Sequence, residues 1–415
     1  MRMRPFGRLA PVETVMARLL REVRPVAGSE ELPLSGALGR VAAERWSAPR
    51  PVPEFSRATW DGFAIRSEDT RSARSERPIQ LRLVGEVFAE ERLPHPLRSG
   101  EAVAIATGGA VPRGADSVVI FEETRSVLGG ILVSRYVRPE ERIAEPGDDF
   151  PKGTALVRAG DVLDPATLGA LAATGRSRLR VYRRPRVALL ANGNELVAPG
   201  RRLRRGQIYE VNNITLSALV AAAGGVARPL TPIGDDPKKI EQALRVALRG
   251  HDLVIVTGGS SVGERDYLPE IFPRVGRLLF HGVAVRPGKP TLAAVAGRRL
   301  LLGMPGHPTS CLSNGFWMLL PVLRRLARLP GPGWLEAPVQ MAEAMAAASP
   351  TMTSVVPLHV EGGRARPTFK DSSAITSLSG VNAYLLRPPG AGPVKVGATV
   401  LARWLPMPLG VPAVP

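Results

Sequence analysis

The sequence lacks the features that build disulfide frameworks and membrane anchors. It has one cysteine among 415 residues, which excludes a disulfide-stapled fold and a zinc site of the C-x-x-C kind. It contains no run of 18 apolar residues, so we expect no membrane-spanning helix. The first eight residues carry charges with no apolar stretch behind them, so we expect no secretory signal. These absences together favour a soluble cytoplasmic protein.

Aromatic residues make up only 5% of the chain, and the 55 basic residues include just six lysines. The formal net charge of +18 favours anionic ligands and steers them toward the protein. However, the basic residues are spread along the chain, without a zinc finger, an RNP-like motif or an arginine-rich tail. We interpret the densest run, Arg201–Arg205, as a solvated loop. We expect phosphate-bearing small molecules as ligands and no nucleic-acid partner.

The remaining composition is that of a globular protein, with 44% apolar and 22% charged residues. The length corresponds to two to four domains of roughly 100–200 residues each. Residues 11–24 and 161–174 have helical apolar spacing, and 178–186 has the composition of a linker. Short Val- and Ile-rich segments bounded by Gly and Pro predict the strands of a small β domain: 79–87, 101–106 and 117–121.

From residue 186 onward, strands and helices alternate. Continuously apolar segments predict buried strands at 187–190, 226–230, 252–257, 278–285, 291–295 and 300–303. Helical patterns cover 213–223, 237–248 and 309–328. This alternation predicts a doubly wound parallel sheet with helices on both faces. Residues 335–415 return to short strands and Gly-rich turns, which indicates a small C-terminal β domain.

In a parallel sheet, ligands bind beyond the carboxyl ends of the strands. Five loops that follow the predicted strands are rich in Gly, Ser, Asp and basic residues, and we expect them to meet at one edge of the sheet: 191–195, 234–236, 257–266, 286–290 and 304–310.

The third of these loops has the composition of an anion site. Glycines let backbone N–H groups point together at an anion, and serines add hydroxyl donors; the residues concerned are Gly258, Gly259, Ser260, Ser261 and Gly263. The alternative is a purely structural turn. Lys289 supplies a compact ammonium suited to a phosphate or another oxyanion, although codon usage would also explain it.

Ser310 opens a predicted helix, where neighbouring N–H groups can hold an anion. Plain N-capping by Thr309 or Ser310 is the alternative. Carboxylates beside a phosphate site predict Mg²⁺, which prefers oxygen ligands: Glu195, Asp235, Asp236, Glu264 and Asp266. His307 is a ligand, a proton carrier or a structural hydrogen-bonding residue, and Cys311 packs inside the helix.

A second group of acidic residues and Gly-Gly turns lies in the N-terminal half, within 59–65, 106–116 and 121–123. Ordinary turn chemistry explains it when it is taken alone. Read with the loops above, however, it completes a series of phrases that resembles the molybdopterin molybdenumtransferase family, the MoeA proteins and gephyrin E domains. The phrases are Trp60–Ile65, Ala106–Val119, Gly147–Asp149, Gly206–Asn212, Gly258–Tyr267, Pro287–Pro290 and Met304–Pro308.

The resemblance covers residues 10–410 and implies a multi-domain α/β plus β fold in an elongated homodimer. Domain I, helical and extended, would comprise residues 1–50 and 145–180. Domain II, a small inserted β domain, would comprise 51–144. Domain III, a doubly wound MogA-like α/β domain with the active site, would comprise 181–330, and domain IV, a small β domain, 331–415.

The resemblance also implies an activity. The family inserts molybdate into adenylylated molybdopterin and releases AMP with the help of Mg²⁺, at a site between domain III of one subunit and domain II of the other. A separate molybdopterin adenylyltransferase and molybdoenzymes are the further partners it implies. A non-catalytic carrier of molybdopterin or the finished cofactor, and a scaffold of the same fold, are the competing interpretations.

Residue roles follow from the motifs. Asp61, Thr107, Glu122 and Asp149 would act from domains I and II. Glu195, Asp235 or Asp236, and Asp266 would serve the nucleotide, metal and pyrophosphate chemistry, with Glu195, Asp235 and Asp266 as metal ligands. Lys289 would neutralise the pyrophosphate. Arg286, Lys289 and Ser310 would lie near molybdate, beside Pro305, Gly306 and Ser372 or Ser373.

The chain departs from the family pattern at several positions. Asn194 replaces a carboxylate, and Val211 a hydroxyl residue. Arg286 stands where Lys is common, and His307 where Asn is common. The segment Thr351–Val356 lacks an Arg expected near molybdate.

Overall fold

The computed structural model describes residues 7–87, 95–259 and 266–406. The chain divides into two compact units. The first unit comprises Met1–Glu30, Gly39–Val41 and Val181–Pro415, and the second comprises Glu31–Leu38 and Ala42–Arg180. In the parts of the chain that are described, no helix is long and apolar enough to cross a membrane.

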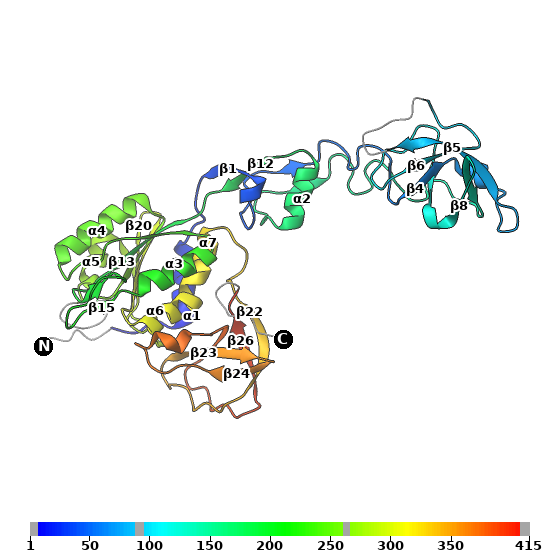
Figure 1. The fold of residues 1–415 in the computed structure, drawn as a ribbon. Helices are drawn as coiled ribbons and strands as arrows, with labels where there is room; N and C mark the ends of the chain where they lie inside the picture. Colours follow the sequence, from blue (N-terminus) through cyan, green and yellow to red (C-terminus); the bar gives the residue numbers. More distant parts are fainter. Residues whose placement is uncertain (1–6, 88–94, 260–265, 407–415) are drawn as a thin grey trace. The chain divides into compact units, whose positions relative to one another are not determined.

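The second unit contains a six-stranded sheet in the order β7-β4-β6-β5-β9-β8 (Figure 1). Its strands are β4 Gly62–Ile65, β5 Ile79–Val87, β6 Glu101–Ile105, β7 Ser117–Ile120, β8 Thr124–Val127 and β9 Gly130–Val133. The three predicted strands are therefore confirmed as β5, β6 and β7. Gly62 is required here because a Cβ atom would lie 2.1 Å from the Val119 carbonyl oxygen of the neighbouring strand.

The rest of the second unit holds helix α2 (Pro165–Ala173) and the short pairs β2 (Trp46–Ser47) with β11 (Ala155–Val157) and β3 (Arg57–Ala58) with β10 (Ile143–Ala144). Asp164 caps α2 by accepting the Thr167 N–H at 2.7 Å, which is a favoured N-cap arrangement.

The prediction that residues 178–186 form a linker is wrong over most of that segment. Arg178–Tyr182 forms strand β12, because Leu179 and Val181 alternate with exposed residues and are fully buried.

The first unit is built on a sheet in the order β16-β13-β17-β21-β20-β18. The strands are β13 Arg186–Ala191, β16 Val226–Pro229, β17 Leu253–Thr257, β18 Arg277–His281, β20 Leu292–Ala296 and β21 Arg299–Met304. The first four in the order are parallel, but β20 is antiparallel to both neighbours. The expected all-parallel sheet is therefore wrong at β20, because a two-residue turn joins it to β21 and such a turn reverses the chain.

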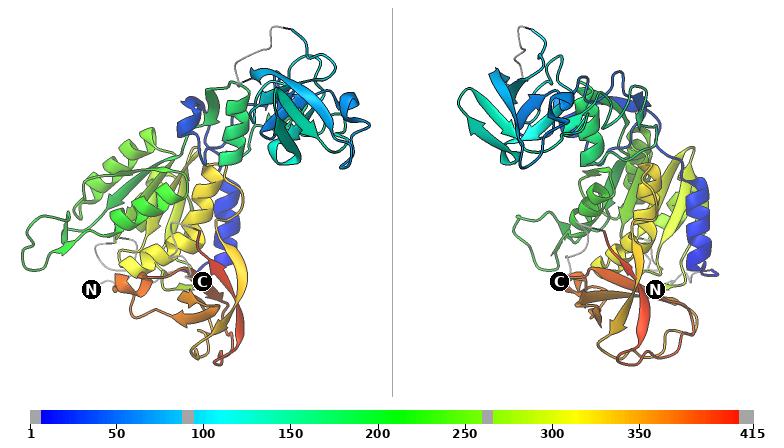
Figure 2. Two further views of the ribbon diagram at one scale, coloured as in Figure 1. Left: turned by 45° about the vertical axis from the view of Figure 1, so that its right-hand side comes forward. Right: turned by 90° about the vertical axis from the view of Figure 1, so that its right-hand side faces the viewer.

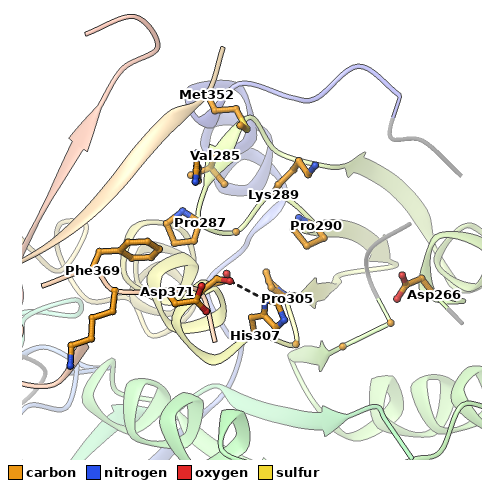
Figure 3. A pocket seen from close by; sticks show the side chains of 18 residues that line it. Asp266, Val285, Pro287, Lys289, Pro290, Pro305, His307, Met352, Phe369 and Asp371 are labelled. Carbon is orange, nitrogen blue, oxygen red and sulfur yellow. Dashed lines mark hydrogen bonds between the residues drawn. The ribbon is translucent and has the colours of Figure 1, made fainter. Parts of the chain in front are cut away.

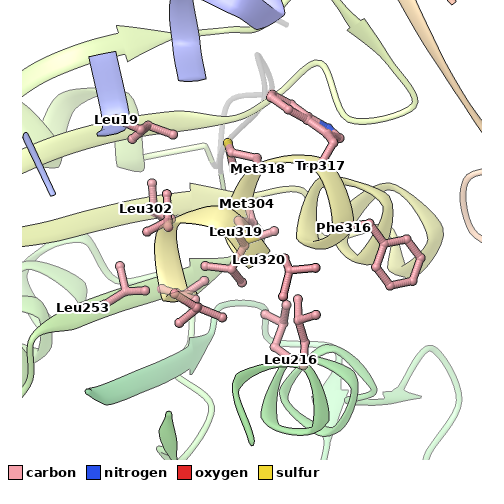
Figure 4. Packing of buried hydrophobic residues seen from close by; sticks show 14 of the residues in the cluster. Leu19, Leu216, Leu253, Leu302, Met304, Phe316, Trp317, Met318, Leu319 and Leu320 are labelled. Atoms are coloured by element: carbon pink, nitrogen blue, oxygen red, sulfur yellow. The ribbon is translucent and has the colours of Figure 1, made fainter. Parts of the chain in front are cut away.

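Helices cover both faces of this sheet (Figures 1 and 2). They are α1 Val12–Glu22, α3 Asn212–Ala222, α4 Pro237–Gly250, α5 Leu268–Val275, α6 Pro308–Asn314 and α7 Leu320–Leu326, with a π-helical segment, Gly315–Leu319, between the last two. Side chains of β13 alternate between the faces. Val187 and Leu189 pack toward α1, α3, α6 and α7, whereas Ala188 and Leu190 pack toward α4 and α5. Figure 4 shows other members of the first cluster, among them Leu19, Leu216 and Leu302.

A C-terminal β barrel completes the first unit. Its strands are β22 Leu335–Met341, β23 Thr353–Glu361, β24 Arg364–Pro367, β25 Ala383–Arg387 and β26 Thr399–Trp404, and the β23–β25 pairing closes it. The strand predicted at 278–285 is split, because Val285–Arg286 forms a separate strand, β19, that pairs in parallel with β23. The loop that follows β19 is therefore anchored to the barrel as well as to the α/β sheet.

Candidate functional site

The five strand-end loops meet at one edge of the α/β sheet, as the sequence predicts. They line two adjoining cavities, of about 700 Å³ and 680 Å³. We name the first the basic pocket, because Arg286, Lys289 and Lys370 line it (Figure 3). We name the second the acidic pocket, because four carboxylates line it: Glu195, Glu210, Asp235 and Asp266. Both pockets share Gly258, Gly259, Asp266, Gly306 and His307.

A buried polar network holds the loop that carries Lys289. The Asn314 side chain donates to the Gly288 carbonyl at 2.9 Å and to the Thr291 hydroxyl at 2.7 Å. Its own oxygen accepts from the Trp317 indole at 2.8 Å. Gly288 has a φ of 114°, and a Cβ atom there would lie 2.2 Å from the Asn314 side-chain oxygen. The sequence analysis missed Asn314, although a polar residue inside an apolar helical run is the signal that marks it.

The barrel supplies one wall of the basic pocket through Phe369, Lys370, Asp371 and Ser372. This segment is tied to the start of α6. The Thr309 N–H donates to the Ser372 carbonyl at 3.1 Å, and the Thr309 hydroxyl donates to the Ala374 carbonyl at 2.7 Å.

The alternative that Thr309 or Ser310 caps the helix is therefore wrong. The helix begins one residue earlier than Thr309, at Pro308, and His307 occupies the N-cap position without a side-chain cap. Ser310 is buried and lines the basic pocket, as does Pro305. The serine predicted from the barrel, Ser373, lines the acidic pocket, while Ser372 lines the basic one.

In the acidic pocket, amide side chains hold the Asp235 carboxylate. The Asn194 side-chain N–H₂ donates to one Asp235 oxygen at 3.0 Å, and Asn192 lies 3.4 Å from the other. The Asn194 oxygen in turn accepts the Asp235 backbone N–H at 3.3 Å. Asp236 instead caps α4 by accepting from Lys238 and Lys239. Of the two alternatives that the sequence leaves open, Asp235 is the one that faces the pocket.

The glycine-rich loop differs from the expected anion cradle. The Gly258 N–H donates to the Met304 carbonyl at 3.1 Å, so the prediction that this N–H binds an anion is wrong. Glycine is needed at 258 because a Cβ atom would lie 2.4 Å from the Asn192 carbonyl oxygen, at a φ of 85°. Gly259 lies beside it and lines both pockets. Ser260, Ser261, Gly263 and Glu264 lie outside the described residues.

Glu210 is a buried carboxylate that the sequence analysis missed. It is 5% exposed, and its oxygens accept the Asn213 N–H at the start of α3. Burial raises its pKa above the ordinary value, because a charged carboxylate loses hydration there. Its neighbour Asn212 donates to the Gly306 carbonyl at 2.8 Å, which connects the acidic pocket to the loop before α6.

The predicted metal ligands Glu195, Asp235 and Asp266 all line the acidic pocket. Within residues 7–87, 95–259 and 266–406, no three His, Cys, Asp or Glu side chains lie close enough together to hold a metal ion.

Of the four site residues predicted in the second unit, Asp61 and Thr107 contact each other. Asp61 accepts the backbone N–H and the hydroxyl of Thr107 at 2.7 and 2.8 Å. These hydrogen bonds, led by the backbone one, lower the pKa of Asp61. Glu122 lies in the 3₁₀ turn Phe121–Glu123, and Asp149 donates its N–H to the Val52 carbonyl. Asp61, Thr107, Glu122 and Asp149 are all exposed.

The α/β layer, its two strand-end pockets and the barrel wall define a multi-domain protein with paired cavities beyond the strand ends of a doubly wound sheet. Family models refine this class. The chain matches the MoeA N-terminal region (domain I and II) over residues 10–175, a probable molybdopterin binding domain over 188–325 and the MoeA C-terminal region (domain IV) over 339–403. The chain belongs to the MoeA family.

Individual relatives agree with this assignment. A molybdopterin molybdenumtransferase of Staphylococcus epidermidis is 31% identical over 374 residues, covering 88% of this chain and 89% of the relative. One from Staphylococcus aureus is 29% identical over 405 residues, covering 94% of each. Among solved structures, two of the molybdopterin biosynthesis MoeA protein from Pyrococcus horikoshii match with TM-scores of 0.81 and 0.83, identities of 32% and 28%, and 96% coverage of this chain. The two matches cover 99% and 100% of the Pyrococcus horikoshii chains.

Proposed function

We propose that this protein is a molybdopterin molybdenumtransferase that inserts molybdate into adenylylated molybdopterin and releases AMP. The observation that carries the proposal is the pair of pockets that meet at Gly258, Asp266 and His307. The basic pocket has three cations and two carboxylates on its wall, and the acidic pocket has carboxylates and amides. An oxyanion suits the cations of the first, and the N–H and O–H groups of an organic molecule suit the acceptors of the second.

The basic pocket is the proposed molybdate site. Arg286 and Lys289 supply the positive charge that a tetrahedral dianion requires, and the anchors of their loop hold both in place before the ligand arrives. β19 ties Arg286 to the barrel, and the Asn314 network holds Gly288 beside Lys289. Charges held in position in this way stabilise a developing oxyanion without a reorganisation cost. Water or a molybdate oxygen attacks the phosphoanhydride, the P–O bond to AMP breaks, and Lys289 neutralises the phosphoryl oxygens as AMP leaves.

The acidic pocket is the proposed site of the organic part of the substrate. Its wall offers hydrogen-bond acceptors, the carboxylates of Glu195, Asp235 and Asp266, to the N–H and O–H groups of a pterin and a ribose. The same oxygens suit Mg²⁺, which commonly takes one or two carboxylates together with substrate phosphates. When bound, Mg²⁺ would reduce the negative charge of the phosphoanhydride.

The parts played by Asp61, Thr107, Glu122 and Asp149, and the homodimer, stay predictions of the family resemblance. The same holds for an adenylyltransferase and for molybdoenzymes as partners.

The test is the release of AMP from adenylylated molybdopterin by the purified chain, with molybdate or tungstate and with or without Mg²⁺. We expect release that depends on the oxyanion, and a fall of at least about a hundredfold for Asp266→Asn because a charge at the reaction centre is removed. Asp164→Asn, which keeps a good N-cap on α2 in the second unit, is the matched control and should release AMP at the wild-type rate. Tight binding of the adenylylated substrate without release would show a carrier instead of an enzyme.

A further inference from the structure

His307 lies at the boundary between the two pockets and lines both of them. It is exposed, and it directly precedes α6, whose first residue is Pro308. Figure 3 shows its imidazole ring inside the basic pocket, with Asp371 nearby and Lys289 on another part of the wall. A titratable ring at this position can contact a ligand in either pocket.

Among the described residues, one hydrogen bond orients the ring. His307 Nδ1 lies 3.1 Å from the Ser372 hydroxyl, and the Thr309 N–H holds the Ser372 carbonyl. A hydroxyl can either donate or accept a hydrogen bond. Ser372 therefore serves the neutral ring, whose Nδ1 can accept, and the charged ring, whose Nδ1 must donate. In the part of the chain that the structure describes, Nε2 makes no hydrogen bond, so it remains available to a ligand.

The charges around His307 make its protonation matter. The basic pocket is lined by three cations, Arg286, Lys289 and Lys370. It is also lined by two carboxylates, Asp266 and Asp371. The Asp371 pKa is lowered chiefly by hydrogen bonds from Ser373, and the nearby charge of His307 contributes to the shift. The acidic pocket, which His307 also lines, adds the carboxylates of Glu195, Glu210 and Asp235. On the wall of the basic pocket alone, the formal excess is one positive charge. A protonated His307 would raise this excess to two, which matches a tetrahedral dianion.

We propose that His307 is a proton-controlled binding group for the oxyanion. Its charged ring donates from Nε2 to an oxygen of molybdate or tungstate, while Ser372 keeps the ring facing the basic pocket. The inference rests on the proposed function, because it takes the basic pocket as the oxyanion site. Histidine is the side chain that ordinarily changes charge between about pH 5 and 8. Oxyanion affinity should therefore rise as the pH falls through that range.

The experiment is titration calorimetry of the full chain with molybdate and with tungstate, at several values between about pH 8 and pH 5.5. We expect the wild-type affinity to increase about tenfold across this range, the effect of one charge-assisted hydrogen bond. His307→Asn can keep the contact with Ser372 but cannot gain a proton. It should bind as the wild type does at pH 8 and show no increase at lower pH.

Two further variants separate local from general effects. His95→Asn changes an exposed histidine of the second unit that lines neither pocket, and it should keep the wild-type pH dependence. Ser372→Ala removes the orienting hydroxyl, and it should reduce the increase at low pH. A pH dependence that survives in His307→Asn would overturn the inference.

The outcomes also separate this inference from the proposed function. Oxyanion binding that is independent of pH, together with normal AMP release, would remove the role of His307 and leave the transferase standing. An absence of oxyanion binding at every pH would overturn the assignment of the basic pocket and this inference with it.

Discussion

The two pockets share one edge of a sheet but hold their charged residues in different ways. In the basic pocket, the Lys289 loop is anchored from beneath by Asn314, Thr291 and Trp317, all of which are buried. In the acidic pocket, Asp235 is held from the side by amide groups of the neighbouring strand-end loop. The difference teaches that the loop of the cationic Lys289 is fixed by the core, whereas the Asp235 carboxylate is fixed by partly exposed loop contacts.

The strongest test of this comparison is Gly288→Ala, which adds a Cβ atom at a φ of 114° and 2.2 Å from the Asn314 side-chain oxygen. We expect a loss of about 3 kcal/mol of unfolding free energy, from backbone strain and overpacking together, measured by chemical denaturation. Oxyanion affinity should fall with it because the Lys289 loop is displaced.

Gly297→Ala is its matched control. Gly297 also has a positive φ, of 62°, but nothing lies within 4 Å of the added atom. The variant should lose only the unfolding free energy that the strained backbone conformation costs, about 1 kcal/mol. Its oxyanion binding should be unchanged. Equal losses in the two variants would show that the Asn314 network does not constrain the loop.

A smaller effect is expected in the acidic pocket from Asn194→Asp. The change replaces the N–H₂ group that lies 3.0 Å from an Asp235 oxygen by a second carboxylate. At neutral pH we expect a loss of about 1 kcal/mol of unfolding free energy, because a hydrogen bond becomes a repulsion. The loss should diminish below about pH 4, where a protonated carboxyl group can donate again.

Asn194→Ala, which removes the donor without adding a charge, distinguishes the two contributions. Its loss should not depend on pH. An Asn194→Asp variant as stable as the wild type at pH 7 would mean that the amide contact does not hold Asp235.

The smallest effect concerns Glu210, whose pKa is raised by burial. An acid with a higher pKa in the folded state stabilises the protein fully below its unfolded-state pKa, about 4.3. This stabilisation is lost as the pH rises through the folded-state pKa. The difference in unfolding free energy between wild type and Glu210→Gln should therefore decrease as the pH rises from about 4 and then level off. A difference that does not change with pH would contradict the buried, desolvated state of this carboxylate.

Much of the fold follows from local patterns in the sequence. Apolar runs such as Leu253–Thr257 predict buried strands, and the apolar spacing of residues 11–24 predicts helix α1, which the structure bounds at Val12–Glu22. Because ligands bind beyond the carboxyl ends of parallel strands, the sequence predicts that the five loops meet at one edge of the sheet. The two adjoining pockets that they line confirm this prediction. Local patterns could not show that Val285–Arg286 leaves the α/β sheet to pair with β23, because strand partners distant in sequence leave no periodic signal.

The sequence by itself determined the element types, the doubly wound core and the loops that carry the site, because apolar periodicity and Gly, Pro and Asp punctuation are local properties. Only the tertiary structure decided which of two adjacent aspartates faces the pocket. It also showed that the Gly258 N–H is already bonded to Met304 and that Asn314 anchors the Lys289 loop. These are contacts between segments far apart in the chain, and they depend on packing geometry that residue type alone does not specify.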